Sequence, residues 1–223
     1  MSTYTLPAKA LVDPVTTVPR VIGEQRWLLP LLLLVVTSIA AGVAFAARWD
    51  AGPDTISGLQ RSGQLMGMTE QDIADKVQLA ERTALVGGVA SGLFLSPLLV
   101  LLVTVALKFA GWLCGTSGTF KALFTAASVG FLPLALKNAI VAVSLLRQPA
   151  VSADQAAKLL PSNLGAFVEV PAWATQAATQ LDFFALWSVG LLGLGFSAAT
   201  GMRKGRALAL LVLLFVLYVG VVH

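Results

Sequence analysis

The chain has 223 residues, of which 57% are hydrophobic and 12% are charged. A soluble domain carries about 25% charged residues, so this composition excludes an ordinary soluble protein and leaves room for one compact membrane domain. The formal net charge of +4 would favour nucleic-acid binding in a soluble protein. Here the basic residues lie in short segments beside apolar stretches, which is how membrane orientation is encoded, so we expect no nucleic-acid partner.

Residues that carry metal or nucleophilic chemistry are scarce. Cys114 is the single cysteine, so no intrachain disulfide can form. His223 is the single histidine, which excludes zinc sites with several His or Cys ligands. A Gly-x-Ser-x-Gly elbow and a phosphate-binding loop ending in Lys-Ser/Thr are also missing from the sequence. We therefore predict a protein that is not an enzyme, with no catalytic residues, no metal and no cofactor.

Five apolar stretches, each near the length of a bilayer crossing, take up nearly half of the chain. A transmembrane helix needs about 20 mostly apolar residues, because roughly 30 Å of hydrocarbon is crossed at about 1.5 Å per residue. The predicted fold class is therefore all-α, a polytopic membrane protein with one domain over residues 27–223 behind an N-terminal arm of residues 1–26. The predicted spans are residues 27–47, 84–107, 122–146, 183–202 and 207–222.

A long loop follows the first span. Residues 49–54 contain Asp, Gly and Pro in a pattern that predicts a turn. Thr69 predicts a helix start, because its hydroxyl can cap the helix while Asp72 complements the exposed amides. Residues 70–82 should form an amphipathic helix that leads into the second span, and its face should pack against the protein's own spans, with a membrane or partner surface as the alternative. The apolar residues of this face are Ile73, Val77 and Ala80.

The second long loop comprises residues 148–181. A short helical pattern begins after Ser152 and stops at Pro161, and Pro171 lies farther along. Tryptophans near the ends of the spans suit the aromatic belt, where an amphipathic ring sits at the depth of the lipid headgroups. These residues are Trp27, Trp49 and Trp173.

The charged residues differ between the two sides of the predicted membrane. The N-terminal arm, residues 108–121 and residues 203–206 together hold eight basic and two acidic residues. Residues 48–83 and residues 147–182 together hold six basic and nine acidic residues. Lysine and arginine concentrate in cytoplasmic loops, so we expect the N-terminus in the cytoplasm and the C-terminus outside.

Prolines and glycines inside the spans predict local distortions and close helix contacts. Pro97 and Pro133 each remove a backbone donor and should kink their helices. Glycines let two helices approach closely because they lack a Cβ. The candidates for such packing are Gly88, Gly92, Gly190 and Gly193. We expect contacts within one chain, and a homodimer face stays an alternative.

Lys137 is the candidate for an intramembrane charge site. It lies inside the third span, where a lysine costs about 2.5–3.5 kcal/mol on insertion scales. Such a residue faces a pathway or a partner, or else snorkels to the membrane surface. We predict that Asp182, at the outer end of the fourth span, is its ion-pair partner.

A basic turn joins the last two spans. It contains Arg203, Lys204 and Arg206. The simple interpretation is a signal for membrane orientation. The functional interpretation is a docking site for anionic lipid or for a partner protein, with about 1 kcal/mol for each charge near an anionic surface.

Three places in the sequence resemble the Yip family of membrane proteins, the Rab/Ypt-interacting proteins. The first is the N-terminal arm, with DP at 13–14, PRVI at 19–22 and WLLP at 27–30. The second is GTSGTFK at 115–121, followed by a span that carries Pro133. The third is an acid, a phenylalanine and a tryptophan that enter a glycine-containing span, namely Asp182, Phe183 and Trp187.

The resemblance implies a five-helix Yip-like domain with a cytoplasmic N-terminus, in the cytoplasmic (inner) membrane of a bacterium. It does not imply the eukaryotic role. Eukaryotic members carry a sizeable cytosolic region and act in vesicle traffic with prenylated small GTPases, whereas 26 residues precede the first predicted span here. Some bacterial relatives resemble accessory partners of ABC-type exporters.

Three functions follow as hypotheses. The first is a non-enzymatic accessory protein that binds another membrane complex, such as an ABC-type exporter, through helix faces and outer loops. The second is a small transporter or channel with Lys137 on its pathway. The third is a membrane-organising or trafficking factor. The lipid bilayer is a partner in all three, and self-association into a homo-oligomer stays open.

Overall fold

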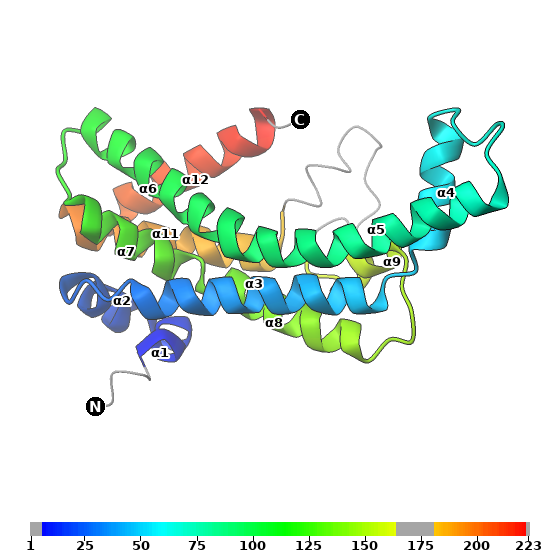
Figure 1. The fold of residues 1–223 in the computed structure, drawn as a ribbon. Helices are drawn as coiled ribbons and strands as arrows, with labels where there is room; N and C mark the ends of the chain where they lie inside the picture. The colour runs from blue at the N-terminus through cyan, green and yellow to red at the C-terminus, as the bar shows by residue number, and fades with distance from the viewer. Residues whose placement is uncertain (1–5, 164–180, 222–223) are drawn as a thin grey trace. The chain divides into compact units, whose positions relative to one another are not determined.

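A computed structural model describes residues 6–163 and 181–221, and the long elements in these ranges are helices (Figure 1). In chain order they are α1 (Leu6–Val12), α2 (Pro14–Gly23), α3 (Leu28–Arg48), α4 (Ala51–Arg61), α5 (Glu70–Ala90), the π-helical turn η2 (Ser91–Leu95), α6 (Ser96–Leu113), α7 (Phe120–Gly130), α8 (Leu132–Leu146), α9 (Ala153–Lys158), α11 (Phe183–Thr200) and α12 (Lys204–Val221). The predicted all-α class is confirmed.

Within the described ranges, four helices are long and apolar enough to cross a membrane. They are Leu28–Arg48, Glu70–Leu113, Phe120–Leu146 and Phe183–Thr200. These helices coincide with or contain most of the first four predicted spans. The predicted fifth span falls on α12, which has 18 residues and is not one of the four.

The described residues belong to two compact units. The first takes residues from Met1–Val35, Ser96–Lys137 and Pro161–His223, and the second takes residues from Val36–Leu95 and Asn138–Leu160. Each unit has its own buried core.

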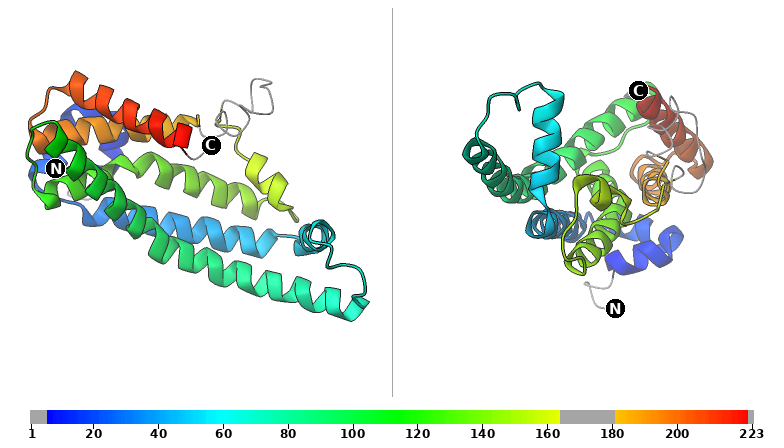
Figure 2. Two further views of the ribbon diagram at one scale, coloured as in Figure 1. Left: turned by 90° about the horizontal axis from the view of Figure 1, so that it is seen from above. Right: turned by 90° about the vertical axis from the view of Figure 1, so that its right-hand side faces the viewer.

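Helix α11 lies at the centre of the first unit. It packs against α2, α7 and α12, and α12 runs beside it (Figure 2). A Cβ added at Gly195 would lie 2.9 Å from the Cβ of Ala126 on α7, so these two helices meet with hardly a side chain between them. Phe196, from the next position of α11, is fully buried. Such close contact matters in a membrane, where dispersion rather than water exclusion holds helices together.

The N-terminal arm contributes to the same core. Asp13 precedes α2 and Pro14 is its first residue, where a missing N–H costs nothing. The amphipathic α2 then buries Val18, Val21 and Ile22 against α7 and α11. The arm is therefore part of the packed first unit.

In the second unit, α3 and α5 approach each other through glycines. A Cβ added at Gly42 on α3 would lie 2.7 Å from the Cα of Gly88. A Cβ added at Gly92 would lie 2.5 Å from the Ile39 side chain. Gly88 and Gly92 are four residues apart and so lie on one side of the helix. Within this unit the pair therefore serves contact between helices of one chain.

Two helix starts that the sequence predicted are confirmed. The Thr69 side chain accepts from the Asp72 N–H and the Asp72 carboxylate accepts from the Thr69 N–H, so a capping box begins α5. Ser152 and Gln155 form the same arrangement at α9. Helix α5 has no buried residue, although Ile73, Val77 and Ala80 are half-buried and α5 contacts α4.

The predicted turn over residues 49–54 is wrong. Asp50 caps α4, and Pro53 lies in the first turn of this helix, where its N–H would have no partner in any case. The Asp54 carboxylate accepts from the Trp49 indole N–H at 2.6 Å and from the Ala153 N–H at 2.9 Å. These bonds lower the pKa of Asp54, with the Trp49 bond as the larger cause. They join the starts of α4 and α9.

Both span prolines mark an interruption in a helix. Pro97 follows η2, so the helical hydrogen-bond pattern widens just before the residue that cannot donate. Pro133 is the second residue of α8, and Phe131 separates α7 from α8. Trp27 and Trp49 flank α3 at its two ends, whereas Pro171 and Trp173 lie outside the described residues.

Replacing Gly88 with alanine should destabilise the protein. The added methyl would lie 2.8 Å from the carbonyl carbon of Gly42, so α3 and α5 would have to separate at a cost of about 1–3 kcal/mol. Gly87→Ala is the matched control, because a Cβ there meets nothing within 4 Å and alanine favours helix by up to about 1 kcal/mol. Unfolding in detergent measures both variants, and equal effects would contradict the contact.

Candidate functional site

Asp182 holds the start of α11. It is the N-cap of this helix, and its Oδ1 accepts from the backbone N–H groups of Phe184 at 2.8 Å and Ala185 at 3.3 Å. These are two of the donors that the first turn of a helix leaves without an intrahelical partner. Capping of this kind contributes about 1 kcal/mol.

The second carboxylate oxygen of Asp182 binds the lysine from the third span. Lys137 Nζ lies 2.9 Å from Asp182 Oδ2, and the Ser162 hydroxyl donates to the same oxygen. The structure thus brings together the two residues that the sequence analysis paired. Ser162 is held in turn by its own carbonyl, which accepts from the Phe183 N–H at 2.8 Å. Asn163 and Asp182 also form an isolated antiparallel bridge.

The Asp182 carboxylate is charged and shielded from solvent. Its side chain is 7% exposed, against 30% for the Lys137 side chain. Burial raises the pKa of Asp182, but hydrogen bonds from Ser162 and Lys137, with the lysine charge, outweigh it and hold the pKa below its ordinary value. The buried anion therefore has a cation, a hydroxyl and two amides around it.

This cluster, Asp182 with Lys137 and Ser162, can join three segments. Lys137 comes from the first half of α8, Ser162 from the chain after α9, and Asp182 from the start of α11. A charge in hydrocarbon is retained where it is paired and hydrogen-bonded. The ion pair explains how a lysine can lie within a span, so a transport pathway is not needed to explain it. A role for the pair in function stays a prediction.

The aromatic residues of the family-like motif lie beside the cluster. Phe183 and Trp187 are one turn apart on α11, with ring centroids 5.6 Å apart, and Phe183 also meets Phe184 edge-on at 5.4 Å. Phe183 is 60% exposed. An exposed ring next to a capped helix start fits the interfacial aromatic belt.

The two candidate packing glycines on α11 differ. A Cβ at Gly193 would lie 3.2 Å from the Cα of Leu208, so this glycine lets α12 approach. A Cβ at Gly190 would meet nothing within 4 Å. Among the described residues of this chain, Gly190 therefore makes no close helix contact, unlike Gly193, and a contact with a second copy of the chain stays a prediction.

The basic turn lies at the other end of α11 from Asp182. Gly201, with φ of 74°, ends α11 in the left-handed conformation that glycine adopts easily. Arg203, Lys204 and Arg206 follow it, and all three are exposed. The 18 residues of α11, about 27 Å at 1.5 Å per residue, separate them from the cluster.

Sequence reasoning missed two polar contacts. Ser162 gave no signal, because isolated serines are common in loops. The Asn138 amide donates to the Ser38 hydroxyl at 2.9 Å in the second unit, which joins α8 to α3. A polar amide inside a predicted span could have indicated such a bond, since an unpaired amide in hydrocarbon is costly.

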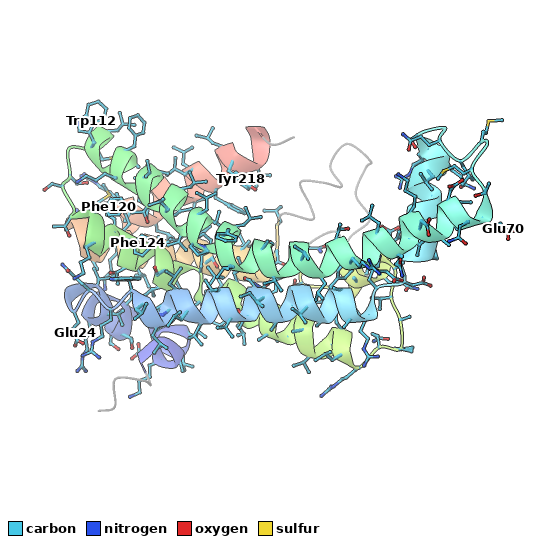
Figure 3. The ribbon with its side chains drawn as sticks, viewed as in Figure 1. Glu24, Glu70, Trp112, Phe120, Phe124 and Tyr218 are labelled. Atoms are coloured by element: carbon cyan, nitrogen blue, oxygen red, sulfur yellow. The ribbon has the colours of Figure 1, made fainter. Side chains whose placement is uncertain are left out.

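Figure 3 shows other charged and aromatic side chains at helix ends. Glu24 pairs with Arg20 and Arg26 at the end of α2, and the hydrogen bond from Arg20, against the opposing effect of burial, lowers the pKa of Glu24. Trp112 and Phe120 lie beside the turn between α6 and α7. Over the described part of the chain, no group of three or more His, Cys, Asp or Glu side chains is placed to hold a metal ion.

Substitutions at Asp182 separate its two roles. Asp182→Asn keeps an oxygen that can cap α11 but loses the ion pair, so the free energy of unfolding should fall by about 1–3 kcal/mol. Asp182→Ala also loses the cap and should cost about 1 kcal/mol more. Thermal and denaturant unfolding in detergent measure both. Asp50→Asn, at the cap of α4, is the control and should change little.

The pH dependence has a definite sign. Because the pKa of Asp182 is lowered on folding, its stabilisation is complete at neutral pH and is lost as the pH falls from the ordinary carboxyl range through the folded pKa. Asp182→Asn should lack this part of the acid destabilisation. An unchanged acid profile, or equal stability of the Asn and Ala variants, would contradict these roles.

Comparison with known proteins places the whole arrangement in a family. The family model described as the Yip1 domain matches residues 8–223, which include the N-terminal arm, the cluster and the basic turn. Neither the curated proteins nor the solved structures that we compared give a match. The match extends over more than half of the chain, and the helices are long and apolar enough to span a bilayer. The chain therefore belongs to the Yip family of membrane proteins.

Proposed function

We propose that this protein is a non-enzymatic accessory membrane protein that binds another membrane protein complex through a helix that extends beyond the bilayer. The observation that carries the proposal is that α5 begins at Glu70, well before the apolar span that it enters. The 14 helical residues 70–83 extend over about 21 Å before the span begins. The apolar span uses residues 84–107, so the polar part before it lies outside the membrane.

The outer part of α5 has the properties of a docking surface. Its start is fixed by the capping box at Thr69, and none of its residues is buried. A helix that is polar around most of its circumference needs a stabilising partner or many local side-chain pairs. Leu79, which is 56% exposed, is an apolar residue in this polar segment. Figure 3 shows Glu70 at the far end of α5.

The resemblance of some bacterial relatives to accessory partners of exporters suggests the partner class. We propose an ABC-type exporter, with α5 meeting its outer surface. The paired state of Lys137 and Asp182 favours this function over a transporter, because the lysine already has a counter-ion. A trafficking role with small GTPases has no support in the contacts described above.

The partner proposal is tested by native purification. A chain tagged at its N-terminus is extracted in gentle detergent, and co-purifying proteins are identified and quantified by mass spectrometry. We expect a stoichiometric membrane complex that Leu79→Arg removes, because a charge there prevents apolar docking. Val15→Arg, at a position on α2 that is 53% exposed, is the control and should keep the complex. A monomer or homo-oligomer from the unaltered chain would contradict the proposal.

We further propose five crossings in a bacterial cytoplasmic membrane, with the N-terminus inside. Helix α12 supplies the fifth, since its 18 residues extend over about 27 Å and are apolar after Arg206. The basic residues of the arm, the turn before α7 and the turn before α12 support this orientation.

Cysteine labelling tests the topology. In intact cells, a membrane-impermeant maleimide should label Gln64→Cys and a cysteine added after His223, both in a Cys114→Ser background. The native Cys114, which is exposed, should react only after the membrane is opened. Protection of the cysteine added after His223, with Gln64→Cys labelled, would show that α12 does not cross.

A further inference from the structure

A surface groove lies in the first unit beside the basic turn. It has a volume of about 330 Å³ and lies between α2, α11 and the first turns of α12. Trp187 and Leu194 from α11 and Leu208 from α12 are among its apolar lining residues, and Lys204 is a charged one. Ligand sites in proteins begin at about 300 Å³, so this volume can hold a small apolar ligand or part of a larger one.

Two glycines keep the groove open. Gly190 and Gly205 both line it, and a Cβ added at either position would meet nothing within 4 Å. Gly190 lies in the middle of α11, where glycine costs about 1 kcal/mol relative to alanine. Packing against α12 does not explain this glycine, because Gly193, one turn on, makes that contact, and no other described residue meets a Cβ at Gly190.

The groove has a charged end and an apolar end. The contact between Gly193 and Leu208, with the short turn at residues 201–203, makes α11 and α12 antiparallel neighbours. Lys204 therefore lies toward the Thr200 end of α11. The apolar lining on α11 extends from Leu194 to Trp187, about 10 Å along the helix and away from the charged end.

The charged end carries an excess of positive charge. Arg203 and Arg206 flank Lys204 in the chain, and all three are exposed. Asp13 is the acidic neighbour of the lining residue Pro14, and its carboxylate accepts a hydrogen bond from Thr16. Lys204 in the lining, with Arg203 and Arg206 next to it in the chain, gives this end the positive charge that an anionic group at the end of an apolar chain requires.

We propose that this groove binds one anionic phospholipid of the surrounding bilayer. Its phosphate lies at the basic turn of Arg203, Lys204 and Arg206, and one acyl chain follows α11 toward Trp187. The groove cannot enclose two turns of a partner helix, which at 10–12 Å across occupy roughly 850–1,200 Å³. A narrow acyl chain has the cross-section and the polarity that the groove requires. This inference is independent of the proposed exporter partner.

The experiment is native mass spectrometry of the full chain in detergent, titrated with phosphatidylglycerol and with phosphatidylcholine of the same acyl chains. We expect one phosphatidylglycerol to be retained about tenfold or more in preference to phosphatidylcholine. Lys204→Gln should weaken the binding of phosphatidylglycerol about fivefold, which is the effect of one charge at an anionic surface. The binding of phosphatidylcholine should not change. Excess inorganic phosphate should not displace the lipid, because the acyl chain is needed.

A matched pair of glycine variants tests the groove itself. Gly190→Leu adds a side chain to the groove at a position where its Cβ meets nothing within 4 Å, and it should abolish binding of the preferred lipid. Gly87→Leu, also a helical glycine with open space beside it, lies on α5 and should leave binding unchanged. The thermal midpoint of each variant establishes that it is folded, and Lys204→Gln decides the question if Gly190→Leu does not fold.

Several outcomes would overturn the assignment. Equal retention of phosphatidylglycerol and phosphatidylcholine would show that the basic turn does not select the lipid. Equal binding of phosphatidylglycerol by Gly190→Leu and Gly87→Leu would show that the groove is not the binding site. Displacement of the lipid by inorganic phosphate alone would show a simple anion site. If a protein co-purifies with the unaltered chain but not with Gly190→Leu, the groove binds a protein instead.

Discussion

The carboxylate of Asp182 is the interaction on which the first unit depends. One oxygen caps α11 through two backbone amides, and the other binds Lys137 and Ser162. Each charged residue stabilises the other in or beside the hydrocarbon, because an isolated charge there is less stable than a paired one. The same residue thus begins the central helix, neutralises a lysine within a span and fixes the chain that follows α9.

Helix α11, which Asp182 caps, contacts several of the other helices of its unit. It packs against α2, α7 and α12, and its glycines differ in whether a neighbouring helix lies against them. Gly193 and Gly195 bring neighbours close, whereas Gly190 faces open space in the groove. The cluster at one end and the basic turn at the other suit a helix that crosses the membrane with a polar anchor at each surface. The proposed accessory function and the proposed lipid site concern different parts of the chain, α5 and the groove beside α12.

Much of this arrangement was predictable from the sequence, for identifiable reasons. Charged residues are so few that Lys137 had few possible partners, and Thr69 and Ser152 carry local capping signals that tertiary packing does not override. Helix α4 was missed because Gly52 and Pro53 are typical of turns, although proline is tolerated in the first turn of a helix. The open side of Gly190 and the bond from Ser162 depend on segments far apart in the chain, and no local pattern encodes them.

A double-mutant cycle between Lys137→Met and Asp182→Asn, in lipid nanodiscs, tests the central interaction most directly. Each variant alone leaves its former partner without its counter-ion, whereas the double variant leaves two neutral side chains, so the two losses in unfolding free energy should not add. We predict a coupling of at least about 1 kcal/mol between the two positions. Additive losses, with coupling near zero, would show that the pair does not hold α11 in place and would contradict this description of the fold.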